Sequence, residues 1–342
     1  MVFQPQPLVS VITPVYNGAK YLAECIESVL AQTYKNWEYV IVNNCSSDNS
    51  LQIAQEYQKR DHRIRIHNNR EHVGVIQNHN IAFRQMSRES QYCKVLQADD
   101  WLFPDCIDQM VNVAEPNPNV GIVGSYNLCH KWVKCDGLPY PSTVVSGRDI
   151  CRQTLLGLVY PFLSPTSLLV RSGIIRARQS FYNESHIYAD VEASYEVLRH
   201  FDFGFVHQIL VYIRRHDESM SSSFARPLNS FILGELYYLT QFGPTYLTPE
   251  EHRKQSRKAW GNYYGFLARS LLRFRERKFW EYHRSELKKM GYPFSWIKLG
   301  RALALNGFDL LFNPKRSTEI AIRKLVEFGQ VRYKRHQTTC DN

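Results

Sequence analysis

The chain begins with short apolar runs, separated by stretches in which apolar residues recur at helical spacing. Leu22, Ile26, Val29 and Leu30 form such a stripe, which predicts a helix with one buried face. Apolar runs predict strands at residues 9–12, 37–42, 64–66 and 95–96, and the segments between them predict helices at residues 19–32, 49–60 and 76–87. Because strand and helix alternate with short loops, we predict βαβ units and a mostly parallel sheet flanked by helices, an α/β fold.

Polar residues follow the ends of these predicted strands. Pro14 cannot donate a ladder hydrogen bond, so the first strand is expected to end there. Residues 43–48 form a polar loop after the second strand, and Asp99 and Asp100 follow the fourth. Right-handed crossovers place the ends of parallel strands on one edge of a sheet. We therefore expect residues 13–17, residues 43–48 and the two carboxylates to converge on one cleft, where open α/β sheets bind ligands.

The rest of the chain divides into a mixed region and a helical tail. The pattern predicts helices at residues 105–113, 148–158 and 191–200, strands at 120–126, 165–170, 203–206 and 209–213, and an irregular loop over the cleft at 128–146. Residues 219–223 are rich in serine and predict a hinge. The tail carries an apolar stripe formed by Trp260, Tyr263, Phe266, Leu267, Leu271 and Phe274. We expect a first domain at residues 1–222 and a basic, aromatic-rich helical region at residues 223–342.

Composition indicates a packed protein from a reducing compartment. The 342 residues are 44% hydrophobic and 13% aromatic, which suits a large core. The sequence lacks both a run of about 18 apolar residues and the basic and apolar blocks of a secretory signal. The eight cysteines contain no C-x-x-C pair, so they predict reduced thiols and neither disulfides nor a zinc site. We therefore expect a cytoplasmic protein.

Positive charge is concentrated in the tail. Residues 251–342 contain 21 Lys and Arg against 8 Asp and Glu, whereas residues 1–250 contain 21 against 24. A basic tail on a nearly neutral domain predicts an anionic partner, either phospholipid headgroups or nucleic acid. We see no nucleic-acid-binding module beside these residues, so we expect no nucleic acid partner. Peripheral association with the inner face of the plasma membrane is the expectation that remains.

The Asp99-Asp100 pair is the first candidate for chemistry. Adjacent carboxylates repel each other, and a divalent cation such as Mg²⁺ or Mn²⁺ relieves that repulsion. The alternative is structural, with Asp100 capping a helix and Asp99 in solvent. Asp190 has a similar alternative, because an acidic side chain at a helix start interacts favourably with the helix dipole.

Five segments in order along the chain resemble the family 2 glycosyltransferases, inverting enzymes of the GT-A fold and the hexosyltransferase class. The segments are Val9–Asn17, Ser28–Tyr34, Ala98–Pro104, Tyr188–Glu192 and Tyr212–His216, and the resemblance covers about residues 8–222. The resemblance implies transfer of a sugar from a nucleotide sugar, with UDP favoured, to a glycan or lipid-linked acceptor in cell-surface polysaccharide synthesis. It also implies a Mg²⁺ or Mn²⁺ cofactor.

The same resemblance implies a role for each matching residue. Asp190 would be the general base, and Asp99 would coordinate the metal with Asp100 beside it. The nucleotide-sugar pocket would be formed by Thr13, Pro14, Tyr16, Asn44, Asp48 and Asp99, with Arg214 or His216 on the diphosphate. The chemistry agrees, because a departing diphosphate gains charge that a metal and a fixed cation stabilise. An inverting displacement also needs a carboxylate to take the acceptor proton.

This chain departs from the family pattern at several positions. Asn43-Asn44 and Gln97 stand where the family often has Asp, so metal binding depends more on Asp99. A nucleotidyltransferase on a similar scaffold is a second hypothesis, although residues 13–18 do not form its usual glycine-rich basic loop. A non-enzymatic nucleic-acid-binding protein is the third.

Overall fold

A computed structural model describes residues 6–140, 142–162, 164–219, 221–271 and 273–312. The chain forms two compact units. The first unit contains the residues up to Ser223 together with Tyr238–His252. The second contains Phe224–Tyr237 and the residues that follow from Arg253. Each unit is described separately below.

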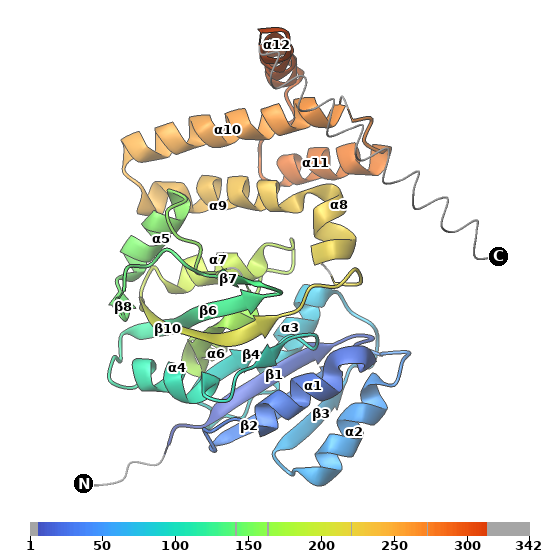
Figure 1. The fold of residues 1–342 in the computed structure, drawn as a ribbon, viewed down its shortest axis with the longest axis vertical. Coiled ribbons are helices and arrows are strands. Elements are labelled where there is room, and N and C mark those ends of the chain that lie inside the picture. The colour runs from blue at the N-terminus through green and yellow to red at the C-terminus, as the bar shows by residue number, and fades with distance from the viewer. Residues whose placement is uncertain (1–5, 141, 163, 220, 272, 313–342) are drawn as a thin grey trace, which may run out of the picture. The chain divides into compact units, whose positions relative to one another are not determined.

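The first half of the first unit is a set of parallel βαβ units, as predicted (Figure 1). The strands are β1 Val9–Val15, β2 Trp37–Asn43, β3 Ile64–Asn68 and β4 Tyr92–Val95, and the helices between them are α1 Ala19–Leu30, α2 Ser50–Arg60 and α3 Val75–Arg84. In the sheet these strands lie in the order β3-β2-β1-β4. The carboxyl ends of all four strands therefore lie on one edge.

The sheet continues through strands from the second half of this unit. They are β5 Trp101–Leu102, β6 Val120–Cys129, β7 Trp132–Lys134, β8 Val144–Val145, β9 Leu168–Arg171 and β10 Asp202–Ile213. The order continues as β4-β9-β6-β10-β5, with β7 on β6 and β8 on β10. Strand β9 is antiparallel to both of its neighbours, whereas β6 and β10 are parallel. The mostly parallel α/β sheet predicted from the sequence is confirmed.

Four local predictions were wrong. Strand β1 continues past Pro14, which is paired with Val42. The carbonyl of Ile12 accepts from Leu96, so Pro14 faces the same side, where pairing with β4 has already ended and no donor is needed. Residues 128–146 include β7 and β8, and β10 is one strand because register shifts near residues 206–211 absorb the break expected there. Residues 165–170 begin with a 3₁₀ turn, η1 (Pro165–Ser167), before β9.

Helices cover both faces of the sheet. The remaining helices of this unit are α4 Cys106–Ala114, α5 Gly147–Leu155, α6 Ser172–Arg176 and α7 Ala189–Val197. Ile12 of β1 belongs to one hydrophobic cluster with Phe83 of α3, and Val11 belongs to another with Ile26 of α1. Alternate residues of a strand point to opposite faces, so the sheet is buried on both sides.

The second unit is helical. Its elements include η2 Ser221–Ala225, α8 Arg226–Leu228, α9 Ser230–Tyr246, α10 Pro249–Leu271, α11 Arg277–Lys289 and α12 Trp296–Phe312, of which η2, α9 and α10 also contribute residues to the first unit. His283 is buried between the Tyr263 hydroxyl at 3.0 Å and the Leu228 carbonyl at 2.9 Å. Phe274 does not join the predicted core stripe, because α10 ends before it and its side chain is exposed. Within the described ranges, no helix has the length and apolar character needed to cross a bilayer.

Gly147, at the start of α5, allows a test of how closely the segments of the first unit pack. A Cβ atom there would lie 2.1 Å from the Phe201 carbonyl oxygen and 2.2 Å from that of Leu198. Gly147→Ala should therefore destabilise the protein by about 1–3 kcal/mol, measured as a lower urea midpoint. Gly173 in α6 has no neighbour within 4 Å, so Gly173→Ala is the matched control and should be neutral or slightly stabilising. Equal losses from both substitutions would contradict the prediction.

Candidate active site

The loops after β1 and β2 are held together at the carboxyl edge of the sheet. Ser47 donates its backbone N–H to the Asn17 side chain at 2.8 Å, and Gly18 donates to the Ser50 hydroxyl at 2.8 Å. Asn17 adopts a left-handed conformation with φ of 50°, which an asparagine tolerates better than most residues. The structure therefore brings together residues 13–17 and 43–48, as the strand order requires.

Asp48 joins the starts of two helices. Its carboxylate accepts from the backbone N–H of Ala19 in α1 at 2.9 Å and from that of Ser50 in α2 at 3.0 Å. Partial burial would raise the pKa of Asp48, but the hydrogen bonds from Ser50 and Ala19 outweigh it, so the pKa lies below its usual range. The structure thus uses this carboxylate to build the loop.

The other residues predicted for the nucleotide pocket have different environments. Thr13 is buried and donates to the Leu96 carbonyl at 2.8 Å, and Pro14 is buried beside it. Asn44 is buried, and its side-chain oxygen accepts from the Val73 backbone at 3.0 Å. Tyr16 is 52% exposed. Of these four side chains, Tyr16 is therefore the one most open to a ligand.

Asn44 and Tyr16 both connect to the segment before α3. The Asn44 amide also donates to the Val73 carbonyl at 2.9 Å, so both ends of this side chain hold that segment. The Tyr16 ring contacts the His72 ring edge to face, with centroids 4.5 Å apart. His72 is exposed, and only the fold brings the two rings together.

Asp99 and His216 face each other beyond the ends of β4 and β10. The Asp99 carboxylate lies 2.8 Å from His216 Nε2. The other ring nitrogen of His216 is buried, and no hydrogen-bond partner for it is found among the described residues. The Tyr21 ring lies against the imidazole, with centroids 5.0 Å apart. A carboxylate oxygen and an imidazole nitrogen are thus adjacent at the carboxyl edge of the sheet.

Asp100 points into the protein and joins three segments. One of its carboxylate oxygens accepts from the Arg214 backbone N–H at 2.9 Å, and the other accepts from the Thr166 hydroxyl at 2.8 Å. Burial, together with repulsion from Asp99, raises the pKa of Asp100 well above its usual range, although these two donors oppose the shift. The two neighbouring carboxylates therefore differ in kind, since Asp100 is a buried structural link and Asp99 faces the site.

Arg214 extends the polar cluster toward α1. Its Nε donates to the Asp99 carbonyl at 3.0 Å, and its guanidinium is paired with Glu24. The guanidinium carbon also lies 4.4 Å from the Tyr21 ring centroid and 5.0 Å from that of Trp101. These contacts hold a cation next to the Asp99–His216 pair.

No sequence motif pointed to Lys94, yet its buried side chain supports this cluster from within the core. It lies in the apolar run of β4, and its buried ammonium donates to the Thr166 carbonyl at 2.5 Å and to the Leu168 carbonyl at 3.3 Å. Burial lowers the pKa of Lys94. The signal for its role was a lysine within an apolar strand, and its effect is to fix the η1 turn whose Thr166 hydroxyl holds Asp100.

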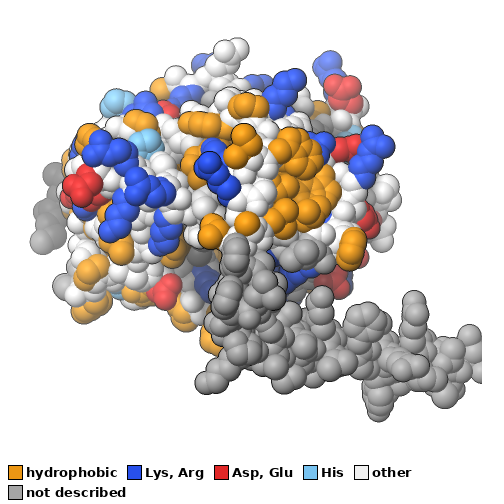
Figure 2. All heavy atoms as spheres, turned by 90° about the horizontal axis from the view of Figure 1, so that it is seen from above, with side chains coloured by type: hydrophobic (Ala, Val, Ile, Leu, Met, Phe, Trp, Pro, Cys, Tyr) orange, Lys and Arg blue, Asp and Glu red, His pale blue; other side chains and the backbone are white. Residues whose placement is uncertain are grey.

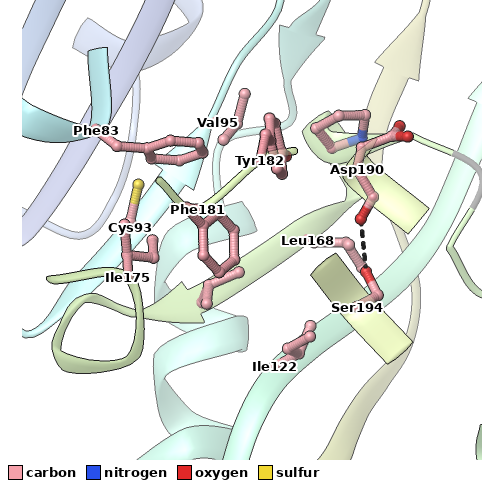
Figure 3. Close-up of a pocket in the computed structure, with 12 residues that line it drawn as sticks. Phe83, Cys93, Val95, Ile122, Leu168, Ile175, Phe181, Tyr182, Asp190 and Ser194 are labelled. Carbon is pink, nitrogen blue, oxygen red and sulfur yellow. Dashed lines mark hydrogen bonds between the residues drawn. The ribbon is translucent and has the colours of Figure 1, made fainter. Parts of the chain in front are cut away.

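Asp190 lies in the first turn of α7 and lines a small apolar pocket with Pro165 and Tyr182 (Figure 3). Burial raises the pKa of its carboxyl to about 6, although the Val191 N–H stabilises the ionised form. Pro165 is the residue before Thr166, which is hydrogen-bonded to Asp100. Consecutive Cα atoms are about 3.8 Å apart, so the η1 turn joins the lining of the Asp190 pocket to the residue that holds the Asp100 carboxylate.

Comparison with known proteins identifies the family to which this chain belongs. The sequence profile of Glycosyl transferase family 2 matches residues 10–131. An uncharacterized glycosyltransferase of Haemophilus influenzae is 30% identical over 231 residues, which cover 65% of this chain and 70% of that protein. This chain belongs to glycosyltransferase family 2. Glycosyltransferase GlyG of Streptococcus pneumoniae is also 30% identical, over 148 residues that cover 43% of this chain and 47% of that protein.

Solved structures agree on the fold of this family 2 glycosyltransferase. S. aureus TarS 1–349 in complex with UDP-GlcNAc superimposes with a TM-score of 0.53 at 17% identity, covering 75% of this chain and 80% of that one. Mannosyltransferase PcManGT from Pyrobaculum calidifontis, in complex with GDP-Man and Mn²⁺, gives a TM-score of 0.51 at 14% identity and covers 92% and 83%. The prediction of a GT-A fold is confirmed, and the chain is a sugar-transferring enzyme.

The Thr166 hydroxyl provides a test of the buried link. Thr166→Val should leave an oxygen of Asp100 without its donor and lower the free energy of unfolding by about 1–3 kcal/mol, measured by urea denaturation. Thr166→Ser keeps the hydroxyl and should cost less. If the valine and serine variants have the same stability, Thr166 does not hold Asp100 in the way that the geometry indicates.

Proposed function

We propose that this family 2 enzyme is a metal-dependent inverting glycosyltransferase that moves a sugar from a nucleotide sugar to an acceptor hydroxyl. The observation that carries the proposal is the Asp99–His216 pair, 2.8 Å apart at the carboxyl edge of the sheet. Arg214 adds a fixed cation beside this pair, and Asp190 adds a separate carboxylate reached through the η1 turn. Together they supply the two functions of an inverting displacement, which are stabilisation of the leaving group and removal of a proton.

Asp99 and His216 suit a divalent metal ion. Adjacent ligands of an ion held at about 2.1 Å lie about 3 Å apart, close to the separation of their facing atoms. Across the described ranges, no group of three or more His, Cys, Asp or Glu side chains is placed to hold a metal ion. We infer that Asp99, with His216 beside it, would hold Mg²⁺ or Mn²⁺ together with donor phosphates, since Mg²⁺ is usually bound by one or two carboxylates plus substrate phosphates. When bound, the ion would neutralise charge on the departing diphosphate.

Arg214 would act on the same diphosphate from the protein side. Its guanidinium is held over the Tyr21 and Trp101 rings and is paired with Glu24 at the surface. The diphosphate group of a nucleotide sugar carries more negative charge in total than one carboxylate, so the donor would compete with Glu24 for the guanidinium. Arg214 would thus be aligned before the donor arrives, which lowers the cost of ordering it during binding.

Asp190 would take the proton of the acceptor hydroxyl. A carboxyl with a pKa of about 6 is ionised at neutral pH and is a better proton acceptor than an ordinary aspartate. The pocket that Asp190 lines has mostly apolar walls, which include Pro165 and Tyr182, and such surroundings favour the neutral carboxyl and so raise its pKa. The side chain therefore has both the ionisation state and the surroundings of a general base.

The donor is proposed to be a UDP-sugar, bound in the cytoplasm. The solved neighbours are complexes with UDP-GlcNAc and with GDP-Man, which supports a nucleotide sugar but not one base. Tyr16 and His72 provide an exposed pair of rings beside the β1 and β2 loops, where a base can stack. The proposed acceptor is a glycan or lipid-linked glycan of the cell surface.

Metal dependence is the first test of this function. EDTA should abolish transfer from UDP-GlcNAc or another accepted donor, and Mn²⁺ should restore it. Asp99→Asn and His216→Ala should each raise the Mn²⁺ concentration needed for half-maximal activity by about 10–100-fold. Asp105→Asn is the matched control, because Asp105 is exposed and accepts from Thr33 outside this cluster. Full activity in EDTA would contradict the assignment.

Removal of the general base is the second test. Asp190→Asn should lower kcat by about 10²–10⁴-fold while the affinity for the donor is retained. With metal and donor saturating, wild-type kcat should rise with pH up to about 6 and then level off, because the base must be ionised. Glu196→Gln on the same helix is the matched control and should keep the wild-type rate and pH profile. Wild-type turnover in Asp190→Asn would exclude the role.

A further inference from the structure

The second unit has a surface on which aromatic and basic side chains from three helices meet. We name it the aromatic–basic surface and define it by Trp260, Arg284, Tyr292, Phe294, Trp296 and Lys298. Trp260 lies on α10, Arg284 on α11 and Trp296 on α12. Every contact described for it below is within this unit.

The rings of this surface form one cluster through Tyr264, whose ring centroid lies 6.1 Å from that of Trp260 and from that of Phe294. Cations lie close to several of these rings. Trp260 contacts Tyr292 with centroids 5.1 Å apart, and Phe294 contacts Trp296 at the same separation. The Arg284 guanidinium lies 5.3 Å from the Phe294 centroid and 5.1 Å from that of Trp296. The Lys298 ammonium lies 4.7 Å from the Trp260 centroid. Positive charge is therefore held within the aromatic cluster.

The start of α12 exposes apolar side chains next to this cluster. Trp296 is 65% exposed and Ile297 is 71% exposed, whereas Leu299 is buried. The same helix is thus anchored through one side chain and presents two large apolar ones to solvent. Large apolar side chains that gather at a surface commonly mark an interaction site. One face of the molecule shows hydrophobic side chains gathered next to Lys and Arg side chains (Figure 2).

The net positive charge of the surrounding segment favours an anionic partner. Residues 253–312 contain 14 Lys and Arg against 4 Asp and Glu. A second copy of the chain would bring two such surfaces together and would be repelled. A single-stranded nucleic acid needs open ring faces on which its bases stack, but cations lie over the rings of Trp260, Phe294 and Trp296.

We propose that the aromatic–basic surface docks on the headgroup region of an anionic phospholipid bilayer. Tryptophan and tyrosine rings are stable at the boundary between hydrocarbon and water. Ile297, beside Trp296, adds an aliphatic side chain that can enter the hydrocarbon. Arg284 and Lys298 meet the lipid phosphates, and each basic residue near such a surface adds attraction. This docking does not depend on the identity of the donor or on the metal.

The test is sedimentation of the full-length protein with phosphatidylcholine vesicles, with and without phosphatidylglycerol. We expect binding to the vesicles that contain phosphatidylglycerol, and weaker binding as salt is raised. Arg284→Gln with Lys298→Gln should weaken binding about fivefold for each charge removed. Trp296→Ser with Ile297→Ser should weaken it about tenfold, through loss of apolar contact.

Matched controls lie in the first unit. Trp132→Ser removes a tryptophan that is 59% exposed, and Lys59→Gln with Arg60→Gln removes two exposed charges from α2; both variants should bind vesicles like the wild type. Asp190→Asn should also bind normally, so loss of docking is separable from loss of transfer. The proposal is overturned if the wild type ignores anionic vesicles, if the surface variants bind as tightly as the wild type, or if the control variants lose as much. It is equally overturned if the surface variants bind vesicles normally but lose binding to single-stranded RNA or to a soluble glycan acceptor.

Discussion

The geometry of the site depends on the buried carboxylate of Asp100. It ties the end of β4 to the η1 turn through Thr166 and to the end of β10 through the Arg214 backbone. A buried acceptor that loses its donor costs about 1–3 kcal/mol, so the two hydrogen bonds hold these three segments together. The position of Asp99 follows, because it is the residue before this link, and its carboxylate faces His216.

Two basic side chains, those of Lys94 and Arg214, stabilise the segments that Asp100 joins. In the core, the Lys94 ammonium donates to the carbonyls of Thr166 and Leu168. These hydrogen bonds fix the η1 turn, whose Thr166 hydroxyl donates to Asp100. On the outer side, Arg214 is held by aromatic rings and by the Asp99 carbonyl. Each charge serves a different purpose, since Lys94 acts within the core and the Arg214 guanidinium remains partly exposed. The first unit therefore holds a cation beside the Asp99–His216 pair without burying it.

The enzyme separates its chemistry from its proposed anchoring. The side chains proposed to act on the donor and the acceptor lie in the first unit, whereas the aromatic–basic surface lies in the second. The pKa of Asp190 is raised by burial in an apolar pocket, which a flexible loop would not provide. The Trp296 and Ile297 side chains stay exposed because Leu299 anchors their helix. Packing thus accounts both for the raised pKa of Asp190 and for the exposure of Trp296 and Ile297.

The sequence by itself determined the order of the strands and helices, and the convergence of the strands' carboxyl ends on one edge of the sheet. Periodicity identifies strands and helices from neighbouring residues, and the handedness of βαβ crossovers is general, so the convergence of the β1, β2 and β4 ends followed from local patterns. Family motifs added roles for Asp99 and Asp190, but the motifs do not say which polar side chains the fold itself uses.

Only the tertiary structure decided which polar side chains are used to hold the fold together, because hydrogen-bond partners come from segments far apart in the chain. The amide of Asn44 holds Val73, and the carboxylate of Asp48 holds the start of α1, so both are engaged within the protein. Pro14 stays in its strand because its neighbour β4 ends earlier. The difference between Asp99 and Asp100 also appears only here, since the two residues follow β4 in a turn and their carboxylates meet different partners, His216 for Asp99 and the buried Thr166 and Arg214 donors for Asp100. Sequence patterns thus specify where polar groups gather, and packing decides which of them remain available for chemistry.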